Sequence, residues 1–224
     1  MPLRGTALEG RRWNAFDEGS TIEIAQRLLG KLFVRIVDGK RRSGWIVETE
    51  AYLPENDSAS HSFRGLSKKN RSMFASPGTL YVYPIHAKYC MNVVTEGEGI
   101  GAAVLIRALE PCEGREEIAL DRPEVVERDW MRGPSRSCIA MRIDRQHDGL
   151  NLFTDNQVWI EDALPRGIYF ETAHSSRIGI SSAQHLPLRF FVRGNRYVSG
   201  LARDHGIPNR HSIMESFPAN SQRP

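Results

Sequence analysis

The arrangement of apolar and polar residues along the chain predicts a series of short strands, and the clearest of them covers residues 44–52. This run reads Gly-Trp-Ile-Val-Glu-Thr-Glu-Ala-Tyr, and its β-branched and aromatic residues follow a turn signal. Successive side chains of a strand point to opposite faces, so Glu48, Glu50 and Tyr52 share one face. Two carboxylates and a phenol are an unusual cover for a core. The pattern leaves open whether this face is solvated, as one face of an antiparallel sheet often is, or forms a functional site.

Further strands are predicted on both sides of this run. Residues 31–37 form a strand that is followed by Asp38-Gly39, a strong hairpin turn signal. Residues 79–83 and 89–95 form a second hairpin with its tip at residues 85–88, and Pro84 favours a sheet edge because it has no N–H to donate. The remaining strand candidates are residues 102–108, 151–154, 157–161, 167–171 and 186–193.

Helices are predicted in three places. Ser20 and Glu23 form the capping-box pattern Ser-x-x-Glu, which begins a helix that continues to about Leu29. Residues 113–120 have a helical pattern, and a proline near the first turn favours another helix over residues 134–141. Together the elements predict an α+β domain with a mostly antiparallel sheet.

Length and composition are typical of a single domain. The chain has 224 residues, enough to bury about 70% of its unfolded surface without a disulfide or metal. We expect residues 1–19 to be a flexible N-terminal arm, residues 20–203 the folded domain and residues 204–224 a polar tail. Residues 54–72 form a long polar loop, and loops of this length are usually functional or disordered.

The compartment is predicted from the cysteines and from hydropathy. Cys90, Cys112 and Cys138 are odd in number and form no CxxC motif, which is typical of reduced thiols. No apolar run reaches the length of a membrane span, and the N-terminus lacks the apolar stretch of a signal peptide. We therefore expect a cytoplasmic protein, associated with the nucleoid if it is bacterial, and no membrane contact.

The net charge is only +3, but charge is segregated along the chain. Residues 58–95 contain no acid, residues 172–210 contain only Asp204, and residues 110–129 are strongly acidic. Such segregation favours a basic face for an anionic polymer, although ordinary surface charge also clusters by chance.

Known nucleotide and metal motifs are missing from the sequence. It contains no Walker loop, GxGxxG, HExxH or Cys/His zinc spacing, so we predict neither a metal nor a cofactor. The candidate catalytic groups that remain are the carboxylates of Glu48 and Glu50. Their like charges raise the pKa of at least one of the two. A carboxylate that activates water is what hydrolysis of a glycosidic bond requires. Nearby tyrosines and His61 offer faces on which a base could stack.

Several longer motifs follow one another in a fixed order over roughly residues 20 to 200. They are Arg42-Ser-Gly-Trp-Ile-Val-Glu-Thr-Glu-Ala-Tyr-Leu53, His61, Asn70-Arg-Ser-Met-Phe74, Pro77-Gly-Thr-Leu-Tyr-Val-Tyr83, Cys90-Met-Asn-Val-Val94, Ala103-Val-Leu-Ile-Arg-Ala-Leu-Glu-Pro111, Gly133-Pro-Ser135, Val158-Trp-Ile-Glu161 and Pro187-Leu-Arg-Phe-Phe-Val-Arg-Gly194. In this order they make the sequence resemble the alkyladenine (3-methyladenine) DNA glycosylase family. The resemblance implies a curved sheet with flanking helices and a protruding hairpin that inserts into DNA.

The resemblance also implies a mechanism, in which a damaged purine is flipped out of double-stranded DNA and its N-glycosidic bond is hydrolysed. Glu50 matches the general base that activates water, with Arg107 and the main-chain carbonyl of Val158 as the partners of that water. By this match Glu48 is a surface or supporting acid. The alternative for Arg107 is a purely structural ion pair.

The base-binding residues follow from the same match. Tyr52, His61 and Tyr83 match the residues that enclose the flipped base, whereas Tyr81 is expected in the core. Asn92 matches the asparagine that screens purine substituents and helps to exclude the amino group of guanine; its alternative is an ordinary polar strand residue. An alkylated purine is cationic, leaves readily and is attracted by aromatic faces, so alkylated purines are expected before hypoxanthine. No lysine nucleophile is indicated, so we predict base removal without strand cleavage. We also expect the protein to be a monomer.

The sequence departs from the family at the hairpin tip. The run from residue 84 to residue 89 is one residue shorter than the family pattern, and His86 stands where a tyrosine wedge is expected. Ile85 shares the wedge role, since apolar side chains also enter base steps. Lys88, Arg64 and Arg71 are expected to contact DNA phosphates.

Two other functions remain open from the residues. The first is a DNA- or RNA-binding domain that has lost base flipping through its altered tip. The second is a hydrolase of free nucleosides that uses Glu48 and Glu50 as a pair, although carboxylates on one strand are poorly placed to flank a bond from opposite sides.

Overall fold

The structure is a computed structural model, and it describes residues 10–164, 168–201 and 213. The described strands are β1 (Arg11–Arg12), β2 (Leu32–Val37), β3 (Lys40–Tyr52), β4 (Leu80–Ile85), β5 (Lys88–Val94), β6 (Ala103–Pro111), β7 (Val158–Asp162), β8 (Thr172–Ser175) and β9 (Arg189–Val192). The described α-helices are α1 (Thr21–Arg27), α2 (Arg115–Asp121) and α3 (Pro134–Ala140), with short 3-10 turns at Arg71–Phe74, Glu127–Asp129 and Arg145–His147.

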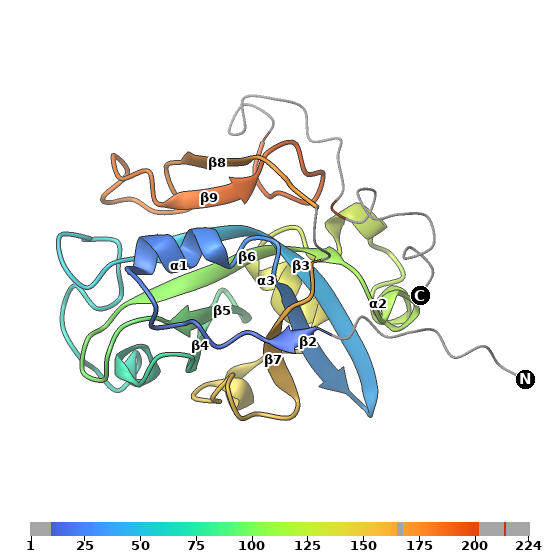
Figure 1. The fold of residues 1–224 in the computed structure, drawn as a ribbon, viewed down its shortest axis with the longest axis horizontal. Coiled ribbons are helices and arrows are strands. Elements are labelled where there is room, and N and C mark those ends of the chain that lie inside the picture. The colour runs from blue at the N-terminus through green and yellow to red at the C-terminus, as the bar shows by residue number, and fades with distance from the viewer. Residues whose placement is uncertain (1–9, 165–167, 202–212, 214–224) are drawn as a thin grey trace, which may run out of the picture.

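One curved sheet organises the described part of the chain (Figure 1). Its strands follow the order β1-β7-β2-β3-β6-β5-β4, with β9 added beside β3 and β8 beside β9. All of these described pairings are antiparallel. The predicted α+β class with a mostly antiparallel sheet is therefore confirmed.

Strand β3 is the centre of the sheet and is paired along both of its edges. One edge pairs with β6; the other pairs first with β2, over residues 40–45, and then with β9, over residues 48–50. Glu48 and Glu50 are fully buried, so the solvated-face interpretation of this strand is wrong. The register between β3 and β6 shifts on both sides of Glu48, and this leaves Val47 and Arg107 without a directly opposite partner. Such bulges redirect side chains, which is how Arg107 reaches the carboxylates.

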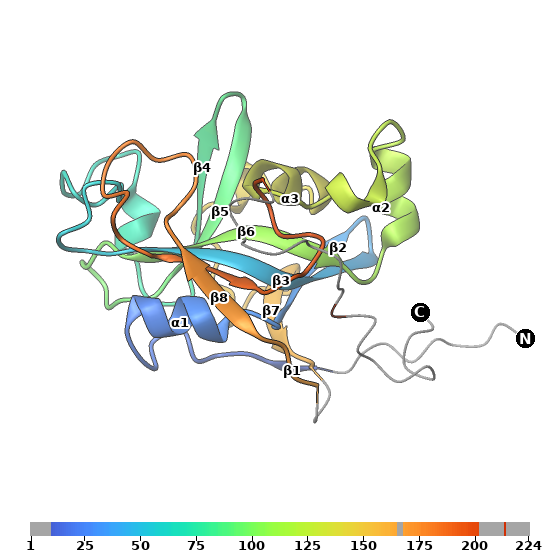
Figure 2. The ribbon, with the colours of Figure 1, turned by 90° about the horizontal axis from the view of Figure 1, so that it is seen from above.

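Helices cover the two faces of the central strands (Figure 2). The predicted capping box of α1 is present: the Ser20 hydroxyl accepts the Glu23 N–H, and the Glu23 carboxylate accepts the Ser20 N–H. Helix α1 packs on β3, where the Thr49 hydroxyl donates to the Ala25 carbonyl. Helix α3 packs on β5 and β6 from the opposite side. Alternation along β3 therefore turns Thr49 toward α1, and Glu48 and Glu50 toward the α3 side.

The β4–β5 hairpin projects from the sheet on the side opposite α1 (Figure 2). Its two-residue tip consists of His86 and Ala87, whose φ angles of 45° and 59° are those of a type I′ turn. Ile85 and Lys88 flank the tip and are exposed, as is His86. Strand β4 lies at the sheet edge, so the interpretation of Pro84 is confirmed.

Several boundaries differ from the sequence-based predictions. Residues 1–9 of the expected flexible arm lie outside the described residues, but residues 10–19 are not loose: β1 pairs with β7, and Trp13 and Phe16 are buried in the core. Residues 151–154 form a turn with only one bridge, because Asn151 pairs with Thr79 alone. The described part of the predicted strand at residues 167–171 is irregular, and β8 begins directly after it. Most of the expected tail lies outside the described residues, but Ile213 is buried and donates its N–H to Glu110.

Candidate active site

A pocket of about 440 Å³ opens between the base of the β4–β5 hairpin, the loop after β3 and the loop before β9. The aromatic and polar side chains that line it include Tyr52, His61, Tyr81, Tyr83, Asn92 and Arg107. Residues 178–182 and Pro134, the first residue of α3, also line it, together with Ser58, Ala59, Met73, Ile85, Cys90 and Leu105. The pocket therefore collects residues from segments that are far apart in the sequence, and the acid-free stretch of residues 58–95 supplies much of its rim.

Glu50 lies beneath this pocket: it does not line the pocket itself, but its three partners Tyr52, Arg107 and Ile178 do. Its Oε1 accepts the Ile178 N–H at 2.9 Å and lies 3.3 Å from an Arg107 Nη, while its Oε2 accepts the Tyr52 hydroxyl at 3.0 Å. Burial raises the pKa of Glu50 above its ordinary value, and the positive charge of Arg107 opposes that rise. Glu50 thus combines a basic carboxylate with acceptor capacity that its partners do not fill.

Glu48 has the opposite character, although it is only two residues away. Its Oε1 accepts from Arg107 Nε at 3.1 Å, from Arg189 Nε at 2.6 Å and from the Ser199 hydroxyl at 3.1 Å; its Oε2 accepts the Ser199 N–H at 2.8 Å. Like Glu50 it is fully buried, but of its partners only Arg107 lines the pocket. The expectation of a surface acid is therefore wrong, whereas a supporting role fits, because Glu48 holds the guanidinium groups beside Glu50.

Arg107 connects the two carboxylates. Its Nε donates to Glu48, one Nη faces Glu50 and also donates to the Ile178 carbonyl at 3.4 Å, and the side chain lines the pocket. The two nearby carboxylates outweigh the effect of burial and raise the pKa of Arg107. Arg107 is thus a structural ion-pair partner and a pocket residue at the same time.

Aromatic rings make up the walls. The His61 ring lies edge-on to Tyr83, with centroids 4.5 Å apart, and its Nδ1 is 2.8 Å from the Tyr81 hydroxyl. Burial raises the pKa of Tyr52 and of Tyr83 far above the ordinary value, so both phenols stay neutral. Desolvation lowers the pKa of His61, which favours a neutral imidazole at neutral pH. Tyr81 is buried as expected, but it also lines the pocket.

Asn92 is fixed within the pocket wall. It is buried on β5, and its Nδ2 donates to the Tyr81 carbonyl at 3.0 Å. This bond fixes the plane of the amide, so a bound group meets a rigid polar edge.

The predicted role of Val158 is wrong. Val158 lies on β7, where it pairs with Arg35 of β2, so β2 separates its strand from β3. It does not line the pocket. The carbonyl that lies near Glu50 and Arg107 belongs to Ile178, in the irregular segment before β9. Residue type carries no signal for a main-chain carbonyl, so the sequence offered no direct way to find Ile178.

A second hollow continues from the pocket along the hairpin. It shares His61, Tyr81, Tyr83 and Ile85 with the pocket and adds Lys69 and Arg145 among its lining side chains. Arg64, Arg71 and Lys88, the predicted phosphate contacts, are all exposed. Lys69 and Arg145 thus place cations beside the pocket, whereas Arg64, Arg71 and Lys88 are not among the residues that line either hollow.

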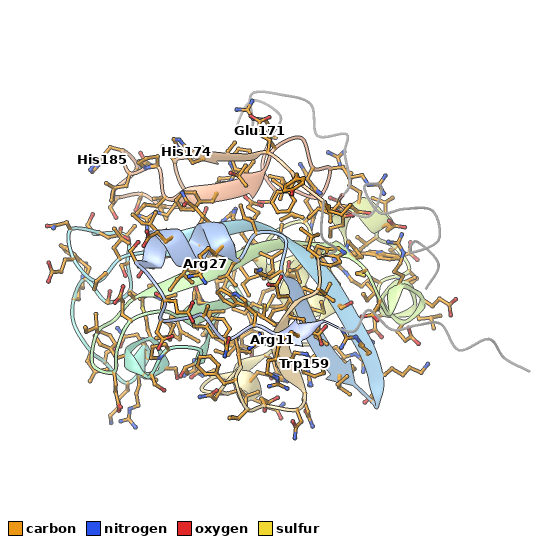
Figure 3. All side chains as sticks on the ribbon, in the orientation of Figure 1. Arg11, Arg27, Trp159, Glu171, His174 and His185 are labelled. Atoms are coloured by element: carbon orange, nitrogen blue, oxygen red, sulfur yellow. The ribbon has the colours of Figure 1, made fainter. Side chains whose placement is uncertain are left out.

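Other polar groups lie elsewhere in the described structure. Glu171, His174 and His185 point outward around the β8–β9 pair (Figure 3). Among the described residues, no group of three or more His, Cys, Asp or Glu side chains could hold a metal ion. None of the described helices has the length and apolarity needed to span a membrane.

Sequence reasoning missed one element of the site, a buried ion pair between Asp57 and Arg177. It lies behind Tyr52, and its guanidinium carbon is 4.5 Å from the centre of that ring. The sequence contained little sign of this pair, because Asp57 and Arg177 lie 120 residues apart in two polar segments.

Comparison with known proteins gives consistent matches. A family model described as methylpurine-DNA glycosylase (MPG) matches residues 15–196. A protein of Rhodopirellula baltica is 50% identical over 203 residues, which is 88% of this chain and 86% of that protein. Proteins of Mesorhizobium japonicum and Chlorobium phaeovibrioides are 45% and 44% identical over 182 and 181 residues, or 80% of this chain in each case and 86% and 91% of those proteins. All three bear the name "putative 3-methyladenine DNA glycosylase".

Proposed function

The chain belongs to the methylpurine-DNA glycosylase family, and on that premise we propose that it is a monofunctional enzyme of base-excision repair. It flips alkylated purines such as 3-methyladenine and 7-methylguanine out of double-stranded DNA. It then hydrolyses the N-glycosidic bond with a water molecule that Glu50 activates.

The observation that carries this proposal is the position of Glu50 beneath a pocket with aromatic walls. Burial gives this carboxylate a raised pKa, and a general base works best when its pKa approaches the working pH. Arg107 keeps a positive charge beside it, which opposes the effect of burial and favours the ionised form. Glu48 is less suited to this role because its oxygens already accept from two arginines and Ser199.

The attacking water has three partners in this arrangement. Glu50 accepts its proton, and the Ile178 carbonyl and the Arg107 guanidinium, which lie 3.4 Å apart, orient it. Holding the water in one place and one orientation removes much of the entropic cost of its attack. The bond that forms joins the water oxygen to the sugar carbon, and the electron pair of the broken bond leaves with the purine.

The chemistry of the pocket favours cationic purines. Tyr52, Tyr83 and His61 offer π faces, and all three are held neutral by their surroundings. A cation is attracted to such faces, and an alkylated purine leaves without a general acid. Neutral purines such as hypoxanthine or ethenoadenine gain neither advantage, so they are secondary substrates. The fixed amide of Asn92 limits which exocyclic groups enter, and so helps to exclude guanine.

The protruding hairpin is the element that holds the duplex open. Ile85 and His86 occupy the gap left by the flipped nucleotide, and Lys88, Arg64 and Arg71 bind phosphates. No lysine is among the described side chains that line the pocket, so the product is an abasic site in an intact strand. The enzyme acts as a monomer, without a cofactor.

The test is the substitution Glu50→Gln, which keeps shape and removes the base. Release of 3-methyladenine from alkylated duplex DNA is expected to fall by at least about 100-fold, while binding to an abasic duplex stays the same. Retained release would refute Glu50 as the base. A wild-type protein that binds damaged duplex but releases no base would favour a non-catalytic DNA-binding domain, and release from free nucleosides would favour a nucleoside hydrolase.

A further inference from the structure

The buried ion pair of Asp57 and Arg177 joins two loops that both line the pocket, the loop after β3 and the loop before β9. It is bidentate: one Arg177 Nη lies 2.6 Å from Asp57 Oδ2 and the other lies 2.6 Å from Oδ1. Neither side chain is exposed. Burial alone would raise the pKa of Asp57, but the bonds from Arg177 hold it below the ordinary value, so the pair is ionised.

The carboxylate and the guanidinium each bind backbone as well. Asp57 accepts the N–H groups of Leu53 and Ala59, which fixes the loop that follows β3. Arg177 donates to the Ala51 carbonyl at 2.9 Å, which fixes the loop that leads to β9 against the end of β3. The next residue, Ile178, supplies the N–H that Glu50 accepts. The pair therefore determines where both the wall and the Ile178 backbone lie.

The pair also places charge behind an aromatic wall. The guanidinium carbon of Arg177 lies over the Tyr52 ring, 4.5 Å from its centre. Tyr52 lines the pocket but Arg177 does not, so the guanidinium is on the far side of the ring as seen from the pocket. A lone positive charge there would repel a cationic base bound against Tyr52, and in a buried site this repulsion is weakly screened. Asp57 cancels that charge.

We propose that the Asp57–Arg177 pair positions Tyr52 and Ile178 and sets the balance between cationic and neutral purines. This inference rests on the proposed function and deepens it. Arg177 supplies the rigid support, and Asp57 keeps the far side of Tyr52 electrically neutral, so the ring retains its attraction for a cationic purine. Neither residue touches the base; both act through Tyr52 and Ile178.

The experiment uses two variants that break the same ion pair and leave opposite charges. Asp57→Asn leaves the guanidinium uncompensated, and Arg177→Met leaves the carboxylate uncompensated. For each protein we would measure single-turnover release of cationic 7-methylguanine from duplex DNA. Release of neutral ethenoadenine from duplex DNA would be measured in the same way, so that the preference is a ratio of two single-turnover rates. The cationic-to-neutral preference is expected to fall about tenfold in Asp57→Asn and to rise in Arg177→Met.

Matched controls separate this role from a loss of stability. Arg42→Met removes another buried arginine, which does not line the pocket. The Arg42 guanidinium pairs with Asp121 at 2.7 Å, and its Nε, like that of Arg177, has no hydrogen-bond partner. It is expected to leave the preference unchanged. Arg177→Lys keeps the charge and should restore the wild-type preference, and all variants are compared at a temperature where circular dichroism shows them folded.

The possible results are distinct. Equal shifts of the preference in Asp57→Asn and Arg177→Met, or no shift in either, would overturn the inference, because a merely structural role affects both substrates alike. If either variant does not fold, the Arg177→Lys/Asp57→Asn double variant replaces it and must show the lowered preference. A wild-type protein that releases no 7-methylguanine would instead overturn the proposed function itself.

Discussion

Replacing Glu48 by Gln should damage stability more than catalysis, the reverse of the expected effect at Glu50. Glu48 is fully buried and neutralises charge on Arg107 and Arg189, and it also accepts from Ser199. A Gln side chain brings no negative charge, and its amide N–H groups would face donors. Breaking a buried ion pair by removing one partner costs about 3–5 kcal/mol, a large part of the ~5–15 kcal/mol that stabilises a typical domain.

The assay compares single substitutions at two sites on β3, Glu48 and Glu50, which are two residues apart. Urea and thermal denaturation, followed by circular dichroism, would give the free energy of unfolding for the wild type, Glu48→Gln and Glu50→Gln. Glu48→Gln is expected to lower the melting temperature by about 6–20 °C. Glu50→Gln should be no less stable than wild type, because burial already disfavours the ionised form of Glu50 and Arg107 keeps Glu48 as its partner.

Base release by folded Glu48→Gln should exceed that of Glu50→Gln, since the Glu48 oxygens are occupied by Arg189 and Ser199, which do not line the pocket. The prediction fails if the free energy of unfolding of Glu48→Gln lies within about 1 kcal/mol of the wild-type value, because removing one partner of a buried ion pair costs more than that. It also fails if Glu48→Gln abolishes release while Glu50→Gln does not.

Two further predictions concern pH and salt. Burial raises the pKa of Glu50, and the base must be ionised to act, so single-turnover release should decline as pH falls through a value above 4.5. By linkage, the stability of Glu50→Gln relative to wild type should increase as pH rises through the same value, and unfolding curves at several pH values would refute this if the difference stayed constant. Lys88→Gln should reduce the slope of log affinity for duplex DNA against log salt by about one unit, whereas Lys40→Gln, whose lysine pairs with Glu117, should leave it unchanged.

Local patterns predicted much of the fold because their causes are local. The capping box at Ser20, the Asp38-Gly39 turn and the edge position of Pro84 depend on a few neighbouring residues, and each was confirmed. The burial of Trp13 and Phe16 was missed, although two large aromatic residues in a polar segment were a usable signal. Strand alternation placed Glu50 and Tyr52 on one face, which matches the hydrogen bond between them.

The rest of the site depends on contacts between distant segments. Alternation could not separate Glu48 from Glu50, because what separates them is Arg189 and Ser199, about 140 and 150 residues later. Resemblance assigned the water-binding carbonyl to Val158, whereas the structure places Ile178 beside Glu50. The bulge that turns Arg107 toward the carboxylates arises from the register of two paired strands, which no single segment encodes.

The dependence of Glu48 on Ser199 has a consequence for how the protein is made. During synthesis β3 emerges early, but the donors that neutralise its buried carboxylate come from a segment 151 residues later. Contacts of such long sequence separation form slowly, and chains of this size fold through incomplete intermediates. A nascent chain that ends before residue 199 would hold Glu48 with an incomplete set of partners. Synthesis of the segment around Ser199, rather than formation of β3, therefore sets the earliest time at which the partners of Glu48 are complete.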